Sequence, residues 1–380
     1  MPKIKVFFIS AANSIHTVKW VNALCRDFEV HLIYCNNHTP GIHNINSKVI
    51  LHKLPFNAPY GYYLNCSFLN HLFRQIKPDI VNVHFASGYG TLARISKIPV
   101  DLLSVWGSDV YAFPKKSKVK KKILEKNIEY ANNIASTSNV MAKELKNVFP
   151  NLSKEIFITP FGVDINLFKP NYKIHSTINI GNIKSLEPIY AIDKGILAIK
   201  TLTENLINQK EFELAKKIRF YVYGDGSEKE NLKKIIKEEN LEKIVYLKGR
   251  IPNIKVPQVL NNLDIFCITS QKESFGVSVV EAMACEKPVV ATNVDGFNEV
   301  MIKQKTGYIE EVNDINSIAE KLEILIKNSK LRQSMGKNGR KTVIKYYDWN
   351  KNVETMTNIY KKLYIESRHK NEIVKKRNIL

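Results

Sequence analysis

The chain has few cysteines for its 380 residues and no regular spacing among them. Its five cysteines are odd in number and scattered, without the close pairs that zinc ligands form. This argues against a disulfide framework and predicts buried thiols in a reducing compartment. The cysteines are Cys25, Cys35, Cys66, Cys267 and Cys285.

Long apolar runs are also missing. No segment approaches the roughly 20 apolar residues that cross a bilayer as a helix. The N-terminal residues 1–9 are typical of a first strand and lack the cleavage region of a signal peptide. We therefore expect a cytoplasmic protein. If it contacts the membrane, we expect peripheral attachment to the inner face.

Acidic residues are in short supply, with 36 against 57 lysines and arginines and a net charge of +21. The first 170 residues hold 21 basic and 10 acidic residues, so about half of the excess lies there. The densest cluster suits an anionic bilayer, although such a cluster can also be a solvated helix face. It consists of Lys115, Lys116, Lys118, Lys120, Lys121 and Lys122. Residues 56–73 are rich in aromatic side chains that suit lipid or a lipid-linked acceptor.

A basic chain can instead bind nucleic acid. This sequence, however, has no RNP, zinc-finger or compact basic-aromatic motif. We therefore expect no nucleic-acid partner, and a non-enzymatic nucleic-acid-binding protein is the least favoured alternative.

Apolar β-rich runs alternate with helical patterns in two series, which predicts two doubly wound α/β domains built on parallel sheets. Strands of the first series are expected at 5–9, 29–34, 48–52, 80–84, 101–105, 133–136 and 155–158. The second series predicts strands at 177–183, 218–223, 244–247 and 263–268, with helices at 189–208, 228–239 and 276–285.

The segment 159–170 carries prolines and a glycine, as a hinge between domains would. We place the first domain at residues 1–168 and the second at 169–348. Residues 349–380 follow as a C-terminal helical segment, with a helical pattern to about residue 368.

Two glutamates stand eight positions apart across the junction of a strand and a helix. Glu273 falls in the predicted loop and Glu281 on the predicted helix. Between them, the amides of Phe275, Gly276 and Val277 belong to the first turn of that helix. Unpaired amides and the helix dipole favour a phosphate at such a position, so two carboxylates would flank an anion site.

This arrangement resembles the motif of the retaining, family-4 glycosyltransferases, the glycosyl transferases of group 1. That motif is a Glu, seven residues, a second Glu and then a stretch like residues 287–292. The Gly-Val-Asp at 162–164, followed by Phe-Lys-Pro at 168–170, matches a second landmark. The resemblance covers nearly the whole chain, with its sharp motifs in the second domain. It implies a GT-B fold, in which two Rossmann-like domains face each other across a cleft and a C-terminal helix crosses back onto the first domain.

The resemblance also implies a donor site. Glu273 would contact the donor sugar and Glu281 the ribose hydroxyls. Lys184 and Lys194 would neutralise the pyrophosphate, and which lysine takes which role stays open. Gly224 and Gly226 would let backbone approach the nucleotide or form a plain turn, and Arg250 lies near the nucleotide or in a surface ion pair. The predicted donor-binding residues are Lys184, Lys194, Gly224, Gly226, Arg250, Ser274, Phe275, Gly276, Val277 and Glu281.

On the acceptor side, residues 10–20 resemble the loop of the first domain that faces the sugar, although Ala11 and Ala12 stand where many relatives have glycines. His84 ends one predicted strand, and Asp109 lies just after the next, where open α/β sheets bind ligands. His16 would face the acceptor or the phosphates, or else pack against its helix. The predicted catalytic residues are Glu273, His84 and Asp109, and the acceptor-side residues are Asn13, Ser14 and His16.

The resemblance implies a retaining transfer of a sugar from a nucleotide-sugar, with a UDP-sugar favoured, to a hydroxyl of a surface glycan or lipid-linked acceptor. Since the sequence has no acidic Asp-x-Asp motif, we expect no metal and no cofactor beyond the donor. A nucleotide-sugar 2-epimerase remains an alternative, because it can share the GT-B architecture. It would turn over donor without any acceptor, which separates it from a transferase. A transferase of central metabolism with a soluble acceptor is another.

Overall fold

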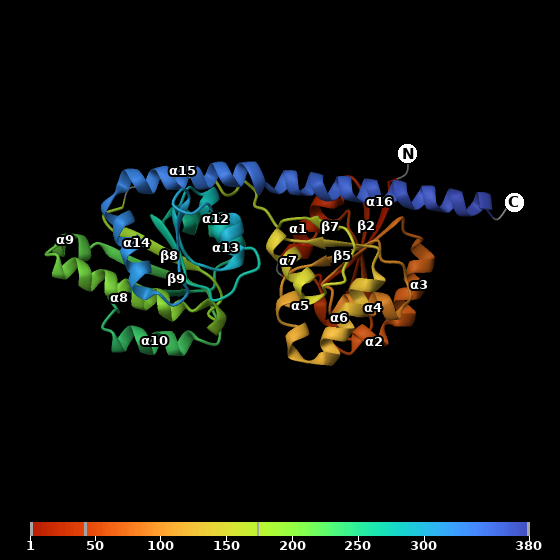
Figure 1. Ribbon diagram of the computed structural model, residues 1–380, viewed down its shortest axis with the longest axis horizontal. Helices are drawn as coiled ribbons and strands as arrows, with labels where there is room; N and C mark the ends of the chain where they lie inside the picture. Colours follow the sequence, from red (N-terminus) through yellow and green to blue (C-terminus); the bar gives the residue numbers. More distant parts are fainter. Residues whose placement is uncertain (1–2, 42–43, 173–174, 378–380) are drawn as a thin grey trace. The chain divides into compact units, whose positions relative to one another are not determined.

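The computed structural model describes residues 3–41, 44–172 and 175–377, with side chains up to residue 369. The chain divides into two compact units. In Figure 1 the first is coloured from red to yellow apart from its dark-blue C-terminal helix, and the second is coloured from yellow-green to blue. The first contains residues 1–161 and 350–380, and the second contains residues 162–349. Each is an α/β unit on its own parallel sheet, as the alternation in the sequence predicts.

The first unit is built on a seven-stranded parallel sheet with the order β3-β2-β1-β4-β5-β6-β7. Every residue of β4 is buried, because helices cover both faces of the sheet. All seven predicted strands are present, although β3 begins two residues later than expected, at Ile50. The strands are β1 Lys5–Ile9, β2 Glu29–Cys35, β3 Ile50–Leu54, β4 Ile80–His84, β5 Leu102–Val105, β6 Asn133–Ser136 and β7 Ile156–Ile158.

Helices connect these strands, and serine caps fix where two of them begin. The Ser117 hydroxyl accepts a hydrogen bond from the Lys120 amide, and the Ser138 hydroxyl accepts one from the Met141 amide. The helices are α1 Ile15–Leu24, α2 Gly61–Leu64, α3 Cys66–Ile76, α4 Gly88–Ile95, α5 Ser108–Tyr111, α6 Lys118–Tyr130 and α7 Asn139–Val148, with short 3-10 turns η1 Asn36–His38 and η2 Pro114–Lys116.

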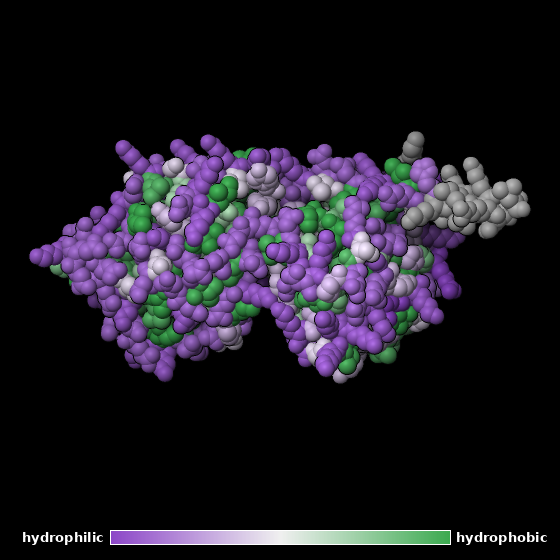
Figure 2. Space-filling model, viewed as in Figure 1, coloured by the Kyte–Doolittle hydropathy of each residue, from purple (hydrophilic) through white to green (hydrophobic). Residues whose placement is uncertain are grey.

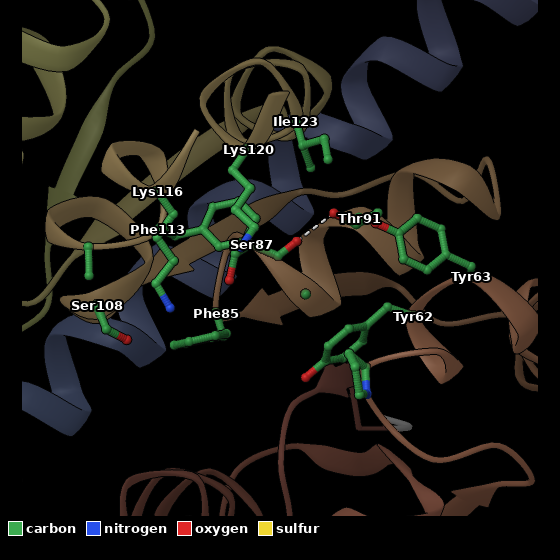
Figure 3. Close-up of a pocket in the computed structure, with 13 residues that line it drawn as sticks. Tyr62, Tyr63, Phe85, Ser87, Thr91, Ser108, Phe113, Lys116, Lys120 and Ile123 are labelled. Atoms are coloured by element: carbon green, nitrogen blue, oxygen red, sulfur yellow. Dashed lines mark hydrogen bonds between the residues drawn. The ribbon is translucent and has the colours of Figure 1, made fainter. Parts of the chain in front are cut away.

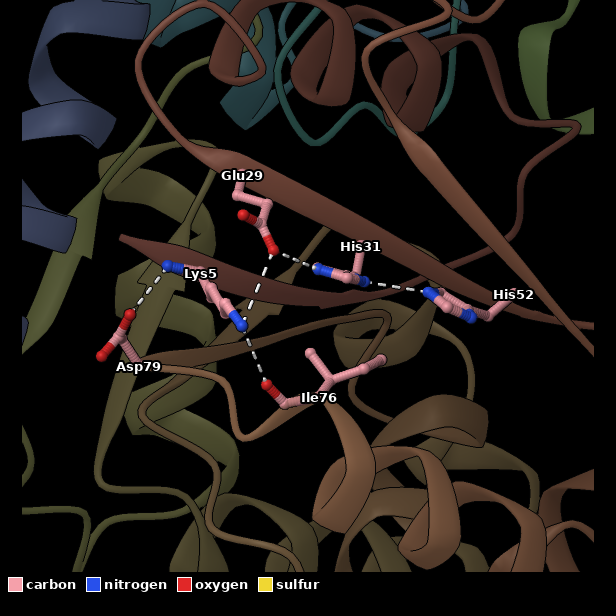
Figure 4. A network of polar contacts seen from close by, with 6 residues as sticks. All are labelled: Lys5, Glu29, His31, His52, Ile76 and Asp79. Carbon is pink, nitrogen blue, oxygen red and sulfur yellow. Dashed lines mark hydrogen bonds and ion pairs between the residues drawn. The ribbon is translucent and has the colours of Figure 1, made fainter. Parts of the chain in front are cut away.

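Polar side chains link the first three strands of this sheet (Figure 4). One ring nitrogen of His31 lies 2.9 Å from His52 and the other lies 3.0 Å from Glu29. The Lys5 ammonium is 3.9 Å from the same Glu29 oxygen. These contacts join β1, β2 and β3 side by side and hold their register.

The C-terminal helix α16 (Trp349–Arg377) returns to the first unit, which confirms the prediction of a helix that crosses back. Tyr360 is completely buried, and its hydroxyl accepts a hydrogen bond of 2.9 Å from the Asn82 amide of β4. Its ring also meets the edge of Phe28. Asn352 donates to the Pro160 carbonyl. The helix extends past residue 368, where the sequence pattern ends.

The second unit has a six-stranded parallel sheet with the order β10-β9-β8-β11-β12-β13. The chain starts in the middle at β8, moves outward to β10 and then resumes at β11 on the other side. A switch point therefore lies between β8 and β11, the place where such sheets bind ligands. The strands are β8 Ile178–Ile183, β9 Ile218–Tyr223, β10 Val245–Gly249, β11 Ile265–Ile268, β12 Val289–Thr292 and β13 Gly307–Glu310.

Helices cover this second sheet, and one of them begins later than predicted. The sequence pattern predicts a helix from residue 189, but Ala191 has a left-handed backbone (φ 43°), which ends a 3-10 turn and delays α8 to Ile192. The helices are α8 Ile192–Asn208, α9 Phe212–Ala215, α10 Lys229–Glu238, α11 Val256–Asn261, α12 Val277–Ala284, α13 Asp295–Val300, α14 Ile315–Lys327 and α15 Ser329–Tyr346, with turns η3 Pro188–Tyr190 and η4 Asn253–Lys255.

The predicted hinge residues 162–168 belong to the second unit in the structure. The Val163 amide donates to the Tyr347 carbonyl at 2.8 Å, and the Trp349 amide donates to the Val163 carbonyl at 2.9 Å. Phe168 is buried, and Arg340 donates to its carbonyl. Because these bonds attach the segment to the end of α15, the unit begins at Gly162 rather than at residue 169.

Within the described residues, no helix is long and apolar enough to span a membrane. The same residues contain no group of three or more His, Cys, Asp or Glu side chains that could hold a metal ion. Four of the five cysteines are buried as expected, and Cys66 is half-buried. Burial raises the pKa of the Cys267 and Cys285 thiols to about 12, so both stay protonated at neutral pH.

Candidate functional site

Two glycines shape the loop between β11 and α12 that carries Glu273. Gly276 precedes the helix with a left-handed backbone (φ 92°), and a Cβ there would lie 2.9 Å from the Phe297 ring. A Cβ on Gly296 would lie 2.7 Å from both the Glu273 carbonyl oxygen and the Phe275 amide. The Gly296 amide donates to that carbonyl at 3.1 Å. The start of α13 therefore fixes the loop in place.

Glu273 pairs with Lys184, although 89 positions separate them in the sequence. The Lys184 ammonium lies 2.5 Å from one Glu273 carboxylate oxygen, and their side chains are only 16% and 13% exposed. The other oxygen accepts a hydrogen bond of 3.2 Å from the Ser274 amide. The ammonium also lies 4.4 Å from the centre of the Tyr190 ring, a cation–π contact. The structure thus brings together two residues that the sequence assigns to the donor from separate motifs.

A cavity of 410 Å³ lies at the carboxyl ends of β8, β9 and β10. Of the predicted donor-binding residues, Lys184, Gly224 and Arg250 line it. The other lining residues are Ile183, Ser185, Tyr223, Asp225, Ile251, Asn253 and Val256. Its size is within the range of small-molecule sites, and two cationic side chains in its wall suit an anionic ligand.

Gly224 and Gly226 are glycines because a neighbouring loop approaches them. Gly224 has φ 154°, and a Cβ there would lie 1.8 Å from the Lys184 carbonyl oxygen. A Cβ on Gly226 would lie 2.4 Å from the Leu186 carbonyl oxygen. The loop that carries Lys184 is therefore held against the loop after β9. Contact of these glycines with a nucleotide stays a prediction.

Lys194 and Glu281 do not line this cavity. Lys194 lies in the first turn of α8 with its ammonium 3.2 Å from Asp193, and Glu281 is half-buried on α12. Within the described part of the chain, the Ser278 hydroxyl is buried at the first turn of α12 without a hydrogen-bond partner. Sequence reasoning missed Ser278 and Tyr190, although both stand inside the two stretches that it singled out.

In the first unit, His84 is completely buried at the end of β4. Its ring stacks on Phe8 with centroids 4.2 Å apart and meets the edge of Trp106 at 5.0 Å. Neither ring nitrogen has a hydrogen-bond partner among the described residues. Burial lowers the pKa of His84 to about 3, so the ring is neutral at neutral pH.

His16 joins the same aromatic cluster. It stacks on Phe161 with centroids 3.9 Å apart and meets the edge of Trp106 at 5.8 Å. Burial, with a smaller effect of nearby Lys19, lowers its pKa to about 4. His16 thus packs on Phe161 and Trp106 rather than only against its own helix, and its contact with an acceptor or with phosphates stays a prediction. Sequence reasoning did not identify Phe161 as part of this cluster.

Asp109 is completely buried, and its carboxylate is occupied by backbone. One oxygen accepts from the Gly107 amide at 2.8 Å and from the Trp106 amide at 3.1 Å, and the other accepts from the Ala86 amide at 3.0 Å. Burial raises the pKa of this carboxyl, and the amide bonds oppose that effect. Asp109 thus ties the loop after β4 to the loop after β5, and its direct contact with an acceptor stays a prediction.

The remaining acceptor-side residues lie at the start of α1. Asn13 is exposed, and Ser14 precedes the helix without a side-chain cap bond. In the basic cluster, Lys115 lies 3.6 Å from Glu144. Across the described ranges, Lys116, Lys118, Lys120, Lys121 and Lys122 have no carboxylate within ion-pair distance.

Two family models match the chain. The model described as glycosyl transferases group 1 matches residues 166–342, and the model described as glycosyl transferase 4-like matches residues 5–138. The second match lies within the first unit and the first match lies within the second unit, so the two matches agree with the division of the chain.

The chain is also similar to named transferases. An uncharacterized glycosyltransferase of Methanocaldococcus jannaschii is 26% identical over 96% of this chain and 97% of its own length. The N-acetyl-α-D-glucosaminyl L-malate synthase of Bacillus anthracis is 24% identical over 74% of each chain. The UDP-Gal:α-D-GlcNAc-diphosphoundecaprenol α-1,3-galactosyltransferase of Escherichia coli is 26% identical over 76% of each.

Among solved structures, the sucrose-phosphate synthase of Thermosynechococcus elongatus has a TM-score of 0.79 over 96% of this chain and all (100%) of its own. Its sequence identity of 15% means that this likeness concerns the fold alone. The fold of two Rossmann-like units is the one that the sequence predicts.

Proposed function

Because the chain belongs to the group 1 family of glycosyl transferases, it is a glycosyltransferase, and we propose the reaction that it catalyses. It moves a sugar from a UDP-sugar, with retention, to a hydroxyl of a surface-glycan or lipid-linked acceptor. The donor and the acceptor class are supported by the Escherichia coli relative, whose name specifies a UDP-sugar and a diphosphoundecaprenol-linked acceptor. The observation that carries the proposal is the mostly buried pair of Lys184 and Glu273 beside the 410 Å³ cavity.

The pair suggests how the donor binds. A diphosphate that enters the cavity competes with Glu273 for the Lys184 ammonium. Lys184 then stabilises the negative charge that develops on the leaving nucleotide, and a cation already held in place needs little reorganisation to do so. Glu273 is released to accept hydrogen bonds from the sugar hydroxyls. Arg250, in the wall of the same cavity, adds a second cation.

The motif around α12 supplies the rest of the proposed donor site. The amides of residues 275–277 would hold phosphate oxygens at the start of the helix, where the dipole favours an anion. Glu281 on the same helix would hold the ribose hydroxyls, as in the family motif. The unpartnered hydroxyl of Ser278 is a further candidate to bond the ligand.

On the acceptor side, His84 offers two unpartnered nitrogens on a neutral ring at the end of β4. A neutral imidazole can accept a proton or a hydrogen bond from a hydroxyl. Trp106 packs against His84, His16 packs against Trp106, and Asp109 fixes the adjoining loops through their amides. We propose that this cluster orients the acceptor hydroxyl.

We also propose that the reaction needs no metal ion, because Lys184 and Arg250 supply positive charge where the diphosphate would bind. Turnover is expected to be unchanged after treatment with EDTA. Complete loss of turnover that added Mg²⁺ restores would contradict this part of the proposal.

Peripheral binding to an anionic membrane is proposed for the basic cluster at 115–122. Each lysine near an anionic surface contributes on the order of 1 kcal/mol. Cosedimentation with vesicles of anionic lipid, but not with neutral vesicles, is the expected result. Absence of cosedimentation would favour the alternative of a soluble acceptor. The N-acetyl-α-D-glucosaminyl L-malate synthase of Bacillus anthracis supports that alternative, because its name specifies L-malate.

The donor proposal is tested by a thermal-shift screen with UDP, GDP, ADP and their sugars. A ligand that binds only the folded state raises its melting temperature. We expect UDP compounds to raise it for the wild type and for a surface control, Glu238→Ala, but not for Glu281→Ala. A shift with none of the nucleotides would refute the donor site, and an equal shift in all three proteins would refute the ribose assignment.

A further inference from the structure

A second cavity, of 420 Å³, lies in the first unit beside the acceptor-side residues (Figure 3). Phe85 in its wall directly follows His84, and Ser108 in its wall directly precedes Asp109. The cavity therefore adjoins the carboxyl ends of β4 and β5, the edge where an open α/β sheet binds its ligand. None of the predicted catalytic, donor-binding or acceptor-side residues lines it, although Lys116 and Lys120 belong to the basic cluster and Tyr62 and Tyr63 to the aromatic segment 56–73.

Most of the wall is apolar or aromatic. These lining side chains are Pro59, Tyr62, Tyr63, Phe85, Phe113 and Ile123. Tyr62 packs over Gly88, where a Cβ would lie 2.4 Å from its ring. The uncharged polar residues of the wall are Ser87, Thr91 and Ser108, and the Thr91 hydroxyl already donates to the Ser87 carbonyl at 2.5 Å. A sugar ring needs many hydrogen-bond partners, so this wall fits an apolar group better.

Two lysines flank the apolar wall. Lys116 comes from η2, and Lys120 comes from the first turn of α6 with its ammonium 5.9 Å from the centre of the Phe113 ring. In contrast to Lys115, neither has a carboxylate within ion-pair distance among the described residues. A pair of ammonium groups without a counter-charge, next to an apolar cavity, is complementary to an anionic group attached to an apolar chain.

Apolar side chains also surround this region on the surface. Tyr60, Tyr63 and Leu64 of the α2 segment are 75%, 54% and 55% exposed, and Val119 at the start of α6 is 68% exposed. Figure 2 shows hydrophobic side chains among hydrophilic ones along the edge of this unit where Figure 1 places α2 and α6. Exposed apolar groups beside unpaired lysines are suited to a lipid surface.

We propose that this cavity holds the phosphate and the first carbons of a lipid-linked acceptor. Lys116 and Lys120 bind the phosphate, and Tyr62, Phe85 and Phe113 contact the carbons next to it. The inference rests on the proposed function, because it assumes that the ligand is an acceptor, and it adds where the lipid end binds and which side chains select it. A soluble sugar acceptor has neither feature and would leave the cavity unused.

The test measures binding of farnesyl phosphate, farnesol and inorganic phosphate by calorimetry, below the concentration at which the lipids aggregate. Lys116→Gln/Lys120→Gln removes both cavity lysines. Lys121→Gln/Lys122→Gln removes the same charge from exposed positions of α6, the helix that carries Lys120, and is the matched control. We expect the affinity of the first variant for farnesyl phosphate to fall by about tenfold or more, because charge-assisted contacts are lost. The second variant should bind farnesyl phosphate about as tightly as the wild type does.

Other outcomes overturn the proposal. Equal weakening in both double variants would mean that only the general field of the lysines acts. If inorganic phosphate binds as tightly as farnesyl phosphate, the cavity is a simple anion site. If farnesol binds as tightly as farnesyl phosphate, the cavity is an apolar pocket that does not recognise the phosphate. Phe113→Ala gives an independent check, because it should weaken the binding of farnesyl phosphate and leave the binding of inorganic phosphate unchanged.

Failure of this inference can be told from failure of the proposed function, because UDP binding is measured on the same samples by thermal shift. Protein that binds UDP but not farnesyl phosphate refutes the cavity assignment and leaves the transferase proposal standing. Protein that binds farnesyl phosphate but no nucleotide refutes the proposed donor and keeps only a lipid-phosphate site.

Discussion

Replacement of His84 by leucine is expected to keep the protein folded at neutral pH, remove the part of its sensitivity to acid that arises from this ring, and abolish transfer. His84 is completely buried without a partner for either nitrogen among the described residues. An unsatisfied buried polar group costs about 1–3 kcal/mol, so an apolar side chain of similar volume should not destabilise the fold much. Retention of such a costly residue suggests a role in the reaction.

The size of the pH effect follows from the pKa. Burial lowers the pKa of His84 to about 3, whereas an unfolded histidine has a pKa of about 6.5. The unfolded chain therefore binds more protons than the folded chain between these values, and stability falls as the pH falls from about 6.5 toward 3. From about pH 7 to about pH 4.5 the loss attributable to His84 is about 2.5 kcal/mol.

Urea unfolding monitored by tryptophan fluorescence at the two pH values would measure this loss, since Trp20 and Trp106 lie in the first unit. The difference between the unfolding free energies at the two pH values should be smaller by about 2.5 kcal/mol in His84→Leu than in the wild type. In His71→Leu, an exposed control, this difference should equal that of the wild type. If His84→Leu loses as much stability in acid as the wild type, the reasoning about a buried neutral ring is wrong. A variant that is stable and fully active would remove His84 from the proposed acceptor site.

The remaining predictions concern the donor loops and the C-terminal helix. Lys184→Ala should lower kcat by about 100-fold or more, while the control Lys200→Ala, which breaks an ion pair with Glu239 outside the cavity, stays active; equal rates would contradict the role of the Lys184 pair. Gly224→Ala should destabilise the second unit by about 3 kcal/mol or more in urea unfolding, because the new Cβ would lie 1.8 Å from a carbonyl oxygen. Gly249→Ala is the control, because its backbone is also left-handed but nothing lies within 4 Å of the Cβ. It should cost only about 1–2 kcal/mol. Tyr360→Phe should destabilise the first unit by about 1–3 kcal/mol, because the buried Asn82 amide loses its partner, and an unchanged midpoint would show that this bond contributes little.

The elements of the fold could be predicted from the sequence because local patterns specify them. Buried parallel strands appear as short apolar runs, and the predicted strands at 5–9, 80–84 and 133–136 have the same bounds in the structure. Helix starts were less predictable. The left-handed backbone at Ala191 is stabilised by its surroundings, among them the Thr269 hydroxyl that donates to its carbonyl, and residue type alone gives no sign of it.

The sequence by itself determined two α/β units, a helical C-terminal segment, and a motif with Glu273 in a loop and Glu281 on a helix, because periodicity and motif spacing are properties of neighbouring residues. The return of that helix to the first unit was implied only by the family resemblance. Only the tertiary structure decided what those residues contact. It pairs Glu273 with a lysine from a distant loop, leaves the nitrogens of His84 unpartnered within the described residues, and occupies the Asp109 carboxylate with three backbone amides. Such contacts join segments that lie far apart in the chain or depend on backbone geometry, and burial and hydrogen bonding are set only when those segments pack together.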